Sequence, residues 1–465
     1  MSDAVFPPLG ESVVQATYER AGFSDVVAER YRKLERDAGR ALDEAGVTGV
    51  GRRTWIVPGR IEVLGKHVDY AGGRSLLCTV ERGIVLIAAP RTDRKVVLRD
   101  ARRREAMVVS LDPSPFPSSQ APLPWAVYPR TVVRRLQHNF GERVVGADIA
   151  LASNLPPAAG VSSSSALVVG LTLGISALSD LASDSRWHEA LVPRTALAGY
   201  CGAMENGLDF GTLAGERGVG TLGGAQDQTA ILCCAPGKLD VFGWTPVLHE
   251  REVSWPTDHV FVIAVSGIVA SKTGAARDRY NRVARTVHHL VHAWNAQGGS
   301  ARTLRDVLTQ SAAGDPSSEL PSDLVRVAHE SANDEFSAAQ LEARLHQFHT
   351  ETWHHVPAAA EALARQDLDM FGRVVAASQR GAEVALENQI PETIHMVSIA
   401  RELGAVAASA FGAGFGGSVW AMIPEVDAER FASRWRDRYV KAFPQVANRV
   451  QVFATKPSAP AFELI

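Results

Sequence analysis

The segment Gly59–Gly73, GRIEVLGKHVDYAGG, carries an arginine, a lysine, a histidine and an aspartate among its glycines. Glycines let a backbone approach a ligand closely and adopt positive φ angles. The polar side chains between them could then bind hydroxyl groups or an anion. Two further glycine-rich segments, Pro156–Ala166 and Phe411–Ser418, lie far downstream. Three such segments in one chain predict a composite site for a phosphorylated ligand.

The segment at residues 155–170, LPPAAGVSSSSALVVG, carries the strongest phosphate signal. The preceding strand is predicted to end at Ser153 and a helix to begin near Ser165. Backbone N–H groups and the macrodipole make a helix N-terminus a phosphate site, and the hydroxyls of Ser162–Ser165 could bind phosphate or help to hold Mg²⁺. The Gly-Lys-Ser/Thr of a P-loop is missing. A serine-rich helix cap explains the segment equally well.

Two other segments are ambiguous in isolation. GGAQDQTAIL, residues 223–232, places Asp227 after two glycines and before an apolar run. An aspartate there could be a general base, although a turn residue is the simpler explanation. The glycines of GAGFGG, residues 412–417, fit a tight turn that leads into a strand as well as they fit a ligand site.

Composition excludes several classes of protein. A chain of 465 residues is too long to fold around a single hydrophobic core of ordinary size, so two or more domains are expected. A hydrophobic fraction of 46% and a charged fraction of 21% are typical of globular proteins. The net charge of −3 predicts no general attraction to nucleic acid or to an anionic membrane. No apolar run has the length of a membrane span, and the N-terminal residues lack the pattern of a secretory signal.

The cysteines indicate a reducing compartment. Cys78, Cys201, Cys233 and Cys234 form no CxxC pair, and adjacent cysteines have poor geometry for a disulfide. We therefore expect buried free thiols in a cytoplasmic protein.

Hydrophobic patterning predicts alternating strands and helices in the first half of the chain. The basic cluster Arg102–Arg104 is interpreted as a solvated hairpin turn, and residues 112–124 as a Pro/Ser loop. The elements are a helix over 12–46, strands beginning at 55, 75, 83, 95 and 106, a helix over 125–140, a strand at 146, helices over 166–181 and 187–205, and strands over TAILCC and KLDVFGW.

A domain boundary is predicted near 250–258. Beyond it we expect a surface loop at 314, strands at 259, over SVWAMIP and over RVQVFAT, and helices over 275–297, 336–365, 367–387, 392–403 and 426–441. Because helices alternate with strands, the fold class is α/β or α+β.

Taken together and in this order, the segments resemble the GHMP small-molecule kinases and, within them, the galactokinases. The galactokinase signature GRxNxxGEHxDYxGG is matched at Gly59, Arg60, Gly65, His67, Asp69, Tyr70, Gly72 and Gly73. The serine segment resembles the family's PxGAGLSSSA at Pro156, Ala159, Gly160 and Ser162–Ser164, and GAGFGG is matched in full.

Shorter matches extend the resemblance over most of the chain, from about residue 50 to residue 425. Asp227-Gln228 resembles the family's MDQ, with Gln226 in place of the methionine. The remaining matches are Glu205-Asn206 to A-E-N/H, Tyr280-Asn281-Arg282 to YNxR, and Trp125 and Tyr128 to the WxxY helix.

The resemblance implies an α+β, two-domain GHMP kinase fold, with a ribosomal protein S5 domain 2-like N-terminal domain and a ferredoxin-like C-terminal domain. Residues 1–50 would be a helical extension, residues 51–255 the N-terminal domain that binds ATP and sugar, and residues 256–465 the C-terminal domain. The implied reaction transfers the γ-phosphoryl group of ATP, with Mg²⁺, to the anomeric C1 hydroxyl of galactose or a close relative. The expected partner is a small-molecule sugar, and we expect no binding to nucleic acid or membrane. The protein would be a monomer or a weak dimer.

The resemblance also implies roles for individual residues. Asp227 would accept or orient the proton of the C1 hydroxyl, while Arg60 neutralises charge on the transferred group. Ser162–Ser164 would hold the β- and γ-phosphates, and Ser164 and Glu205 would bind Mg²⁺. The sugar-binding residues would be Lys66, His67, Asp69, Tyr70, Tyr280 and position 225, an alanine, beside a wall shaped by Gly412, Gly414 and Gly416.

The chain departs from the family pattern near the sugar. Glu62 stands where galactokinases have Asn, and Lys66 stands where they have the Glu that holds the sugar's C6 hydroxyl. Either these two residues form an ion pair, or Lys66 points into the pocket and suits the carboxylate of a uronic acid. We prefer the ion pair, because nothing else in the sequence requires an anionic substrate. The long glycine-rich stretch 207–224 predicts a mobile lid or an insertion beside the site.

Other functions stay open at this point. One is a uronic acid (galacturonate or glucuronate) or arabinose 1-kinase, and another is a non-catalytic sensor of sugar and ATP, although such proteins usually lose part of the serine loop or the carboxylate. Another GHMP branch, such as mevalonate or homoserine kinase, fits HVDYAGG less well. A Rossmann dinucleotide enzyme would need GxGxxG after its first strand.

Overall fold

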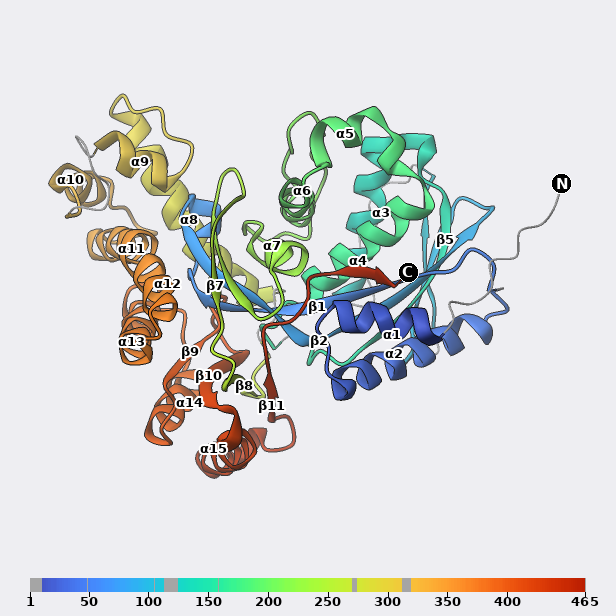
Figure 1. Cartoon of the computed structure of the whole chain (residues 1–465). Coiled ribbons are helices and arrows are strands. Elements are labelled where there is room, and N and C mark those ends of the chain that lie inside the picture. The colour runs from blue at the N-terminus through green and yellow to red at the C-terminus, as the bar shows by residue number, and fades with distance from the viewer. Residues whose placement is uncertain are drawn as a thin grey trace.

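The computed structural model describes residues 11–47, 49–103, 105–112, 124–157, 159–269, 274–311 and 319–464. Over these residues the chain forms two β-sheets, each packed against helices, and a further group of helices at one side (Figure 1). Most of the loop predicted over 112–124, the start of the loop predicted at 314, and Arg104 lie outside the described ranges.

The first sheet has eight strands, in the order β12-β1-β2-β5-β3-β4, with β6 added to β2 and β7 to β6. Only β3 and β5 pair in parallel among these described strands. The strands predicted at 75 and 83 are one continuous strand, β2. The bounds are β1 Arg53–Leu64, β2 Arg74–Arg91, β3 Lys95–Asp100, β4 Met107–Ser110, β5 Gly146–Ser153, β6 Lys238–Gly243, β7 Leu248–Ser254 and β12 Phe462–Leu464.

Helices cover both faces of this sheet (Figure 1). Successive side chains of a strand point to opposite faces, so Ile56 packs with the α2 side while Trp55 and Val57 pack with the α4 side. Helices α1 (Glu11–Arg20) and α2 (Asp25–Asp43) cover one face. The other face carries α3 (Val127–Phe140), α4 (Ser163–Leu178), α6 (Arg194–Asn206) and α7 (Gln226–Cys233), with α5 (Ser185–Leu191) packed on α6.

The second sheet has the order β11-β8-β10-β9 and is antiparallel throughout its described strands. Its strands are β8 His259–Val265, β9 Ala407–Ala410, β10 Ser418–Pro424 and β11 Gln451–Thr455. Helices α13 (Leu368–Val384), α14 (Pro391–Glu402) and α15 (Ala428–Ala442) pack on it. A separate helical core holds α8 (Gly274–Ala296), α9 (Leu304–Ser311), α10 (Ser322–Glu330) and α11 (Ala338–Thr350), and α12 (Val356–Ala364) follows after one π-helical turn.

Three predicted elements need correction. The apolar run TAILCC is the end of helix α7 and not a strand, because a short buried apolar run fits either element. The helix predicted over 12–46 is divided by Gly22, at φ +72°, and by Ser24, whose side chain caps α2. The helix predicted over 187–205 is divided between α5 and α6 at Pro193.

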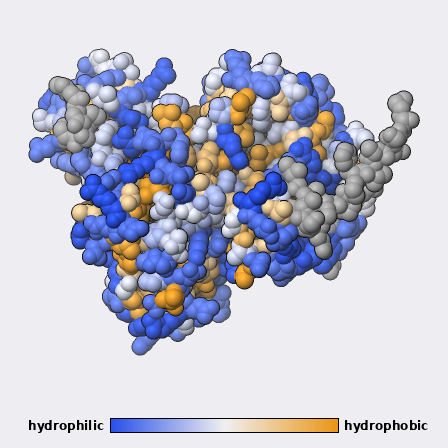
Figure 2. All heavy atoms as spheres, in the orientation of Figure 1, coloured by the Kyte–Doolittle hydropathy of each residue, from blue (hydrophilic) through white to orange (hydrophobic). Residues whose placement is uncertain are grey.

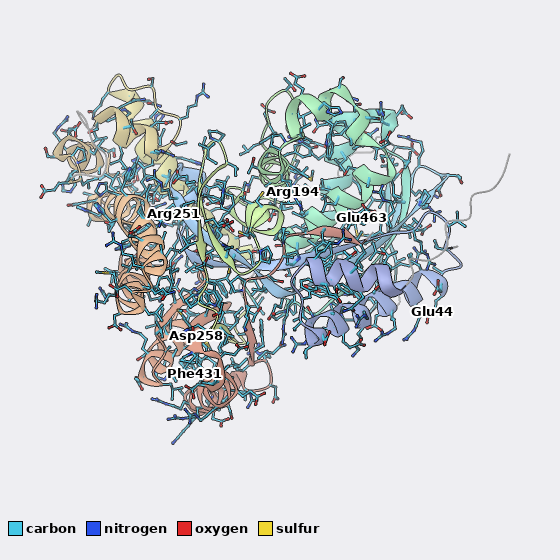
Figure 3. All side chains as sticks on the ribbon, in the orientation of Figure 1. Glu44, Arg194, Arg251, Asp258, Phe431 and Glu463 are labelled. Carbon is cyan, nitrogen blue, oxygen red and sulfur yellow. The ribbon has the colours of Figure 1, made fainter. Side chains whose placement is uncertain are left out.

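The last described strand, β12, returns to the first sheet. The chain passes from the first sheet to the second between β7 and β8, yet β12 returns to pair with β1. Arg53 donates to both carboxylate oxygens of Glu463, at 2.6 and 2.7 Å, and Arg194 donates to the carbonyl of Ala461 at 2.5 Å. In Figure 3 Arg194 and Glu463 lie near the first sheet, well apart from Phe431. The last strand of the range predicted as the C-terminal domain, 256–465, therefore lies in the first sheet.

Hydrophilic residues cover most of the face seen in Figure 2, and apolar residues gather only in small groups on it. Among the described residues, none of the helices combines the length and the apolar character needed to cross a bilayer.

The packing of α2 on the first sheet can be tested at Tyr31. Its side chain is fully buried, and its hydroxyl has no hydrogen-bond partner among the described residues. We expect Tyr31→Ala to lower the free energy of unfolding by ~3–5 kcal/mol, because it leaves a cavity against the sheet. Tyr31→Phe is the matched control and should be neutral or slightly stabilising, since it removes an unpaired buried hydroxyl. Chemical denaturation measures both, and equal effects of the two changes would contradict this packing.

Candidate active site

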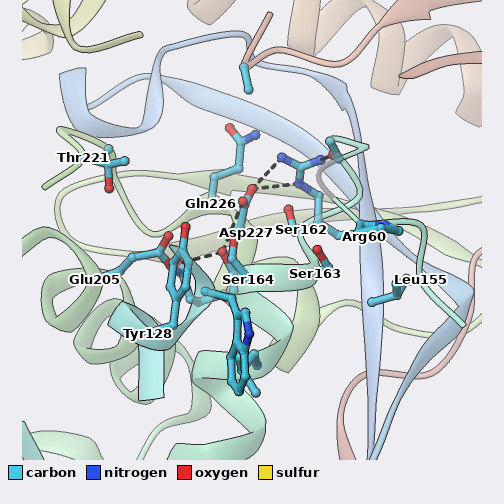
Figure 4. A pocket seen from close by; sticks show the side chains of 18 of the residues that line it. Arg60, Tyr128, Leu155, Ser162, Ser163, Ser164, Glu205, Thr221, Gln226 and Asp227 are labelled. Carbon is cyan, nitrogen blue, oxygen red and sulfur yellow. Dashed lines mark hydrogen bonds and ion pairs between the residues drawn. The ribbon is translucent and has the colours of Figure 1, made fainter. Parts of the chain in front are cut away.

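A cavity of about 370 Å³ lies where the three glycine-rich segments meet (Figure 4). Its wall includes Arg60, Gly160 and Gly412, one from each segment. The start of α7 and the end of α6 complete it through Asp227 and Glu205. The three segments that the sequence predicted to form a composite site therefore line one cavity.

A buried ion pair lies at the centre of this cavity. Arg60 donates to Asp227 Oδ1 from Nε at 2.8 Å, its Nη2 lies 2.6 Å from the same oxygen, and its Nη1 donates to the carbonyl of Gly160 at 2.6 Å. Only 4% of Arg60 is exposed. Burial lowers the pKa of Arg60, but the Asp227 carboxylate outweighs this and raises it above its usual value. The guanidinium is thus fixed in position and in charge.

The local form of β1 makes this pair possible. The register of β1 against β2 shifts between Pro58 and Arg60, so Gly59 lies at a bulge. A Cβ atom at Gly59 would lie 2.7 Å from the carbonyl oxygen of Val161 and from the side chain of Leu155. Glycine therefore lets the serine segment approach the strand closely enough for Arg60 to reach it.

The serine segment opens helix α4 without a side-chain cap. Ser162 stands at the N-cap in a left-handed conformation, with φ +59°, and its side chain makes no cap hydrogen bond. Its buried hydroxyl has no hydrogen-bond partner among the described residues. Ser162–Ser165 all line the cavity. Ser162 therefore stands at the N-cap without capping the helix through its side chain, which leaves the first N–H groups of α4 available to a ligand.

A second carboxylate lies next to the first. Glu205, at the end of α6, is 3% exposed, and its Oε2 accepts a hydrogen bond from Gln228 at 2.7 Å. The hydroxyl of Ser165 lies 3.2 Å from that oxygen and 3.3 Å from Asp227 Oδ2. Because a serine has one hydroxyl proton, it can donate to only one of the two carboxylates at a time. Sequence reasoning missed this link, although Ser165 belongs to the serine run that it singled out.

Asp69, His67 and Tyr280 form a further part of the cavity wall. Asp69 Oδ2 accepts the Gln226 N–H at 3.3 Å, and a Cβ at Gly224 would lie 2.5 Å from the same oxygen. Burial first, and then the Asp227 charge, raise the pKa of Asp69 to about 6. The rings of His67 and Tyr280 lie 5.1 Å apart.

Several predicted sugar-binding residues lie behind this wall. Among the described residues, those lining the cavity do not include Lys66, Tyr70 or Ala225, nor Gly414 and Gly416. Lys66 is fully buried, donates to the carbonyl of Ala410 at 2.9 Å and lies 3.9 Å from Glu62, so the preferred ion pair is confirmed. The Tyr70 hydroxyl lies 2.9 Å from His67 Nδ1 and therefore positions a residue that does line the cavity.

An aromatic and basic end completes the cavity. Trp125 and Tyr128 line it together with Arg102 and Arg103. The guanidinium of Arg103 lies 5.7 Å from the Trp125 ring. Arg102 and Arg103 lie between the antiparallel strands β3 and β4, as the predicted hairpin turn requires, but they also line the cavity, which their charge pattern alone did not indicate.

Two asparagines hold the C-terminal part of the glycine-rich stretch 207–224, for which the sequence predicted a mobile lid or an insertion. Asn206 Oδ1 accepts the Gly223 N–H at 3.0 Å, and Asn281 Oδ1 accepts the Leu222 N–H at 2.9 Å. Asn281 also donates to the carbonyl of Gly220 at 3.0 Å. The asparagines of the A-E-N/H and YNxR motifs therefore hold this stretch against the site.

Comparisons with known proteins agree with this geometry. Residues 47–90 match the galactokinase galactose-binding signature, residues 127–234 the GHMP kinases N terminal domain, and residues 359–441 the GHMP kinases C terminal family. The chain belongs to the GHMP kinase family and has its two-domain α+β fold.

Individual relatives of this chain have low sequence identity to it. The galactokinases of Actinobacillus pleuropneumoniae and Roseiflexus sp. (strain RS-1) are each 25% identical to the chain over 84% of its length, which covers 90% and 88% of those proteins. The crystal structure of Lactococcus lactis galactokinase complexed with galactose has a TM-score of 0.71 at 19% identity, covering 91% of this chain and 98% of that one. L. major mevalonate kinase in complex with R-mevalonate has a TM-score of 0.50 at 16% identity, covering 87% and 96%.

The anchoring of the glycine-rich stretch can be tested at Asn281. We expect Asn281→Ala to speed amide hydrogen exchange at residues 219–224 by about tenfold, because two backbone groups lose their partner. Mass spectrometry of peptides from this stretch measures the change. Arg285→Ala, on the same helix but bonded to Glu335, is the control and should leave the stretch unaltered. Exchange that is fast already in the unaltered protein would favour a mobile lid.

Proposed function

We propose that this chain is an ATP-dependent sugar kinase that phosphorylates the anomeric C1 hydroxyl of galactose or a close relative. The observation that carries the proposal is the buried Arg60–Asp227 pair beside the N-terminus of α4 in one cavity. Membership of the GHMP kinase family supports phosphoryl transfer from ATP. The match to the galactose-binding signature and the curated galactokinase relatives support the sugar.

The arrangement suits phosphoryl transfer, which depends on positioning and charge stabilisation. The C1 oxygen would attack the γ-phosphorus, and the bond from that phosphorus to the bridging oxygen would break and leave its electron pair on ADP. The C1 proton would pass to the Asp227 carboxylate. Arg60, already bonded to Asp227 Oδ1 and to the Gly160 carbonyl, would keep Asp227 ionised and neutralise charge on the transferred group.

The serine segment would bind the triphosphate. Buried polar groups are rarely left unpaired, and a phosphate oxygen would provide the partner that the Ser162 hydroxyl lacks among the described residues. The N–H groups that open α4 would add further donors. The planar rings of Trp125 and Tyr128, at the aromatic end, would suit the adenine base.

The donor set also fits Mg²⁺, which binds proteins through one or two carboxylates together with substrate phosphates. The Glu205 carboxylate and the hydroxyl of Ser164, both in the cavity wall, would hold the ion. When bound, Mg²⁺ would neutralise the charge of the phosphates. Among the described residues, no group of three or more His, Cys, Asp or Glu side chains is arranged to hold a metal without such a ligand.

The competing functions have less support. The hypothesis of a uronic acid substrate required the Lys66 ammonium to contact the sugar. Lys66 is instead fully buried and donates a hydrogen bond to the carbonyl of Ala410. A non-catalytic sensor would not need the Arg60–Asp227 pair and the complete serine segment that this chain retains. A cytoplasmic location, where ATP is available, and a monomer or weak dimer remain part of the proposal.

The catalytic role of Asp227 is tested by Asp227→Asn. We expect kcat for ATP-dependent galactose phosphorylation to fall by about 10²- to 10⁴-fold, because the proton acceptor is lost, while galactose binding persists. Coupled ADP release and mass spectrometry of the sugar phosphate measure this. Asp437→Asn, an exposed position on α15, is the control. A protein that binds sugar and ATP without turnover in its unaltered form would be a sensor instead.

The raised pKa of Asp69 predicts a pH dependence. Because its carboxyl group takes up a proton as the pH falls through about 6, it then no longer accepts a hydrogen bond at full strength from a sugar hydroxyl. We expect kcat/KM for the sugar to decrease below that pH, with an apparent pKa of about 6. Asp69→Asn should lower kcat/KM at neutral pH and remove this acidic limb. An unchanged limb in the variant would assign it to another group.

A further inference from the structure

Three positions at which the chain departs from the galactokinase pattern lie in one contact cluster. Glu62, Lys66 and Gln226 replace the family's Asn, Glu and Met. Lys66 Nζ lies 3.9 Å from Glu62 Oε1, and Gln226 Nε2 donates a hydrogen bond to Glu62 Oε2. Gln226 comes from the start of α7, 164 residues away from Glu62 in the chain. Their contact indicates that the three departures belong together.

A chain of buried hydrogen bonds fixes the direction of the Gln226 amide. The Trp244 indole is only a donor, and it donates to Ser75 Oγ at 3.0 Å. Ser75 is then left to donate its own proton, and its nearer acceptor is Gln226 Oε1 at 2.8 Å. The amide NH₂ group is therefore turned toward Glu62. The reverse orientation would set an amide oxygen against a carboxylate.

Glu62 faces the cavity. Side chains two positions apart on a strand share a face, and Arg60 and Glu62 both line the site. Glu62 is 3% exposed, and its Oε1 has no hydrogen-bond partner among the described residues, with Lys66 Nζ beyond hydrogen-bond range. A Cβ at Gly412 would lie 2.1 Å from this oxygen, so the third glycine-rich segment leaves room for the carboxylate.

Lys66 lies behind Glu62 and not beside the ligand. Its ammonium is bonded to the carbonyl of Ala410, and it does not line the cavity. An isolated buried carboxylate would be very costly, and Lys66 and Arg60 compensate its charge. Burial raises the pKa of Glu62 above its usual value, since Lys66 and Arg60 offset only part of that effect, and burial also lowers the pKa of Lys66. Glu62 therefore lines the cavity, whereas Lys66, whose ammonium lies behind it, does not.

We propose that Glu62 is a specificity-determining residue, which accepts a hydrogen bond from a sugar hydroxyl other than the one phosphorylated. Gln226 and Lys66 are its positioning residues. The site consequently takes neutral sugars and rejects uronic acids, since a second carboxylate would be repelled by Glu62. The acceptor has moved from position 66, where galactokinases carry it, to position 62. This inference rests on the proposed sugar kinase function.

The unaltered protein provides the first test. Initial rates with ATP are measured for galactose, its singly deoxygenated analogues, arabinose, galacturonate and glucuronate. We expect a neutral sugar to react and both uronates to react at least 100-fold more slowly, because a buried acceptor left unpaired or facing like charge penalises binding. A uronate that reacts as well as the neutral sugar overturns the inference while leaving the kinase proposal intact. If no sugar yields a phosphate, the kinase proposal itself fails, and this inference with it.

The variant Glu62→Gln gives the second test. Its amide would present a donor where Glu62 Oε1 presents an acceptor, so we expect kcat/KM for the preferred sugar to fall by about 10- to 100-fold. The loss should disappear for the one deoxy analogue that lacks the recognised hydroxyl, a selectivity that a merely structural role would not produce. Glu361→Gln, on the surface and paired with Arg251 and Arg365, is the matched control.

The variant Gln226→Met leaves Glu62 in place and provides a further test if the Glu62→Gln protein does not fold. We expect a smaller loss of kcat/KM with the same dependence on one hydroxyl, because only the positioning hydrogen bond is removed. Equal losses for every sugar in both variants, or no loss in either, would contradict the role of Glu62.

Discussion

The ion pair between Arg60 and Asp227 is the interaction on which the site depends. It joins residues 167 positions apart and links the first sheet to the start of α7. Through Gly160 the same guanidinium also holds the serine segment. A buried pair of this kind adds little net stability, yet loss of one partner leaves a costly unpaired charge. Its main effect is to fix positions, because β1, the serine segment and the start of α7 must all be correctly placed before both charges are paired.

A second set of contacts joins the segment Gly59–Gly73 to the other half of the molecule. Glu351 accepts the Gly65 N–H at 2.7 Å and the Ser378 hydroxyl at 2.9 Å. Burial raises the pKa of Glu351, but His355, Lys66 and the Gly65 N–H outweigh this and lower it. Glu351 opens the π-helical turn, a form often found at functional sites. Gly65 and Lys66, which directly precede the cavity-lining His67, therefore also take part in the contact between the two halves.

The sequence predicted the elements with strong patterns and missed those without them. Strand β7 was not predicted because its residues are almost all exposed and show no alternation. Strand β12 is only three residues long, and its pairing with β1 depends on contacts over most of the chain. The run TAILCC was placed in the wrong element because burial on all sides removes the periodicity that separates a helix from a strand.

The site was predictable where a motif carries the chemistry. Arg60, Asp227 and the serine segment were found because their spacing matches a known family. The alternative positions of Lys66 could not be decided from the sequence, since only the fold brings Ala410 to its ammonium. Gln226 was noticed as a departure, but its link to Glu62 requires α7 to begin beside β1. The role of Ser165 likewise depends on two carboxylates that are distant in the chain.

The return of β12 to β1 has a consequence for biosynthesis. Arg53 and its partner Glu463 are separated by 410 residues. A ribosome adds about 5–20 residues per second, so one edge of β1 stays uncovered for tens of seconds after that strand has emerged. An exposed strand edge is a template for pairing with other chains. The nascent protein therefore passes through a period in which shielding of this edge by a chaperone would favour correct folding over aggregation.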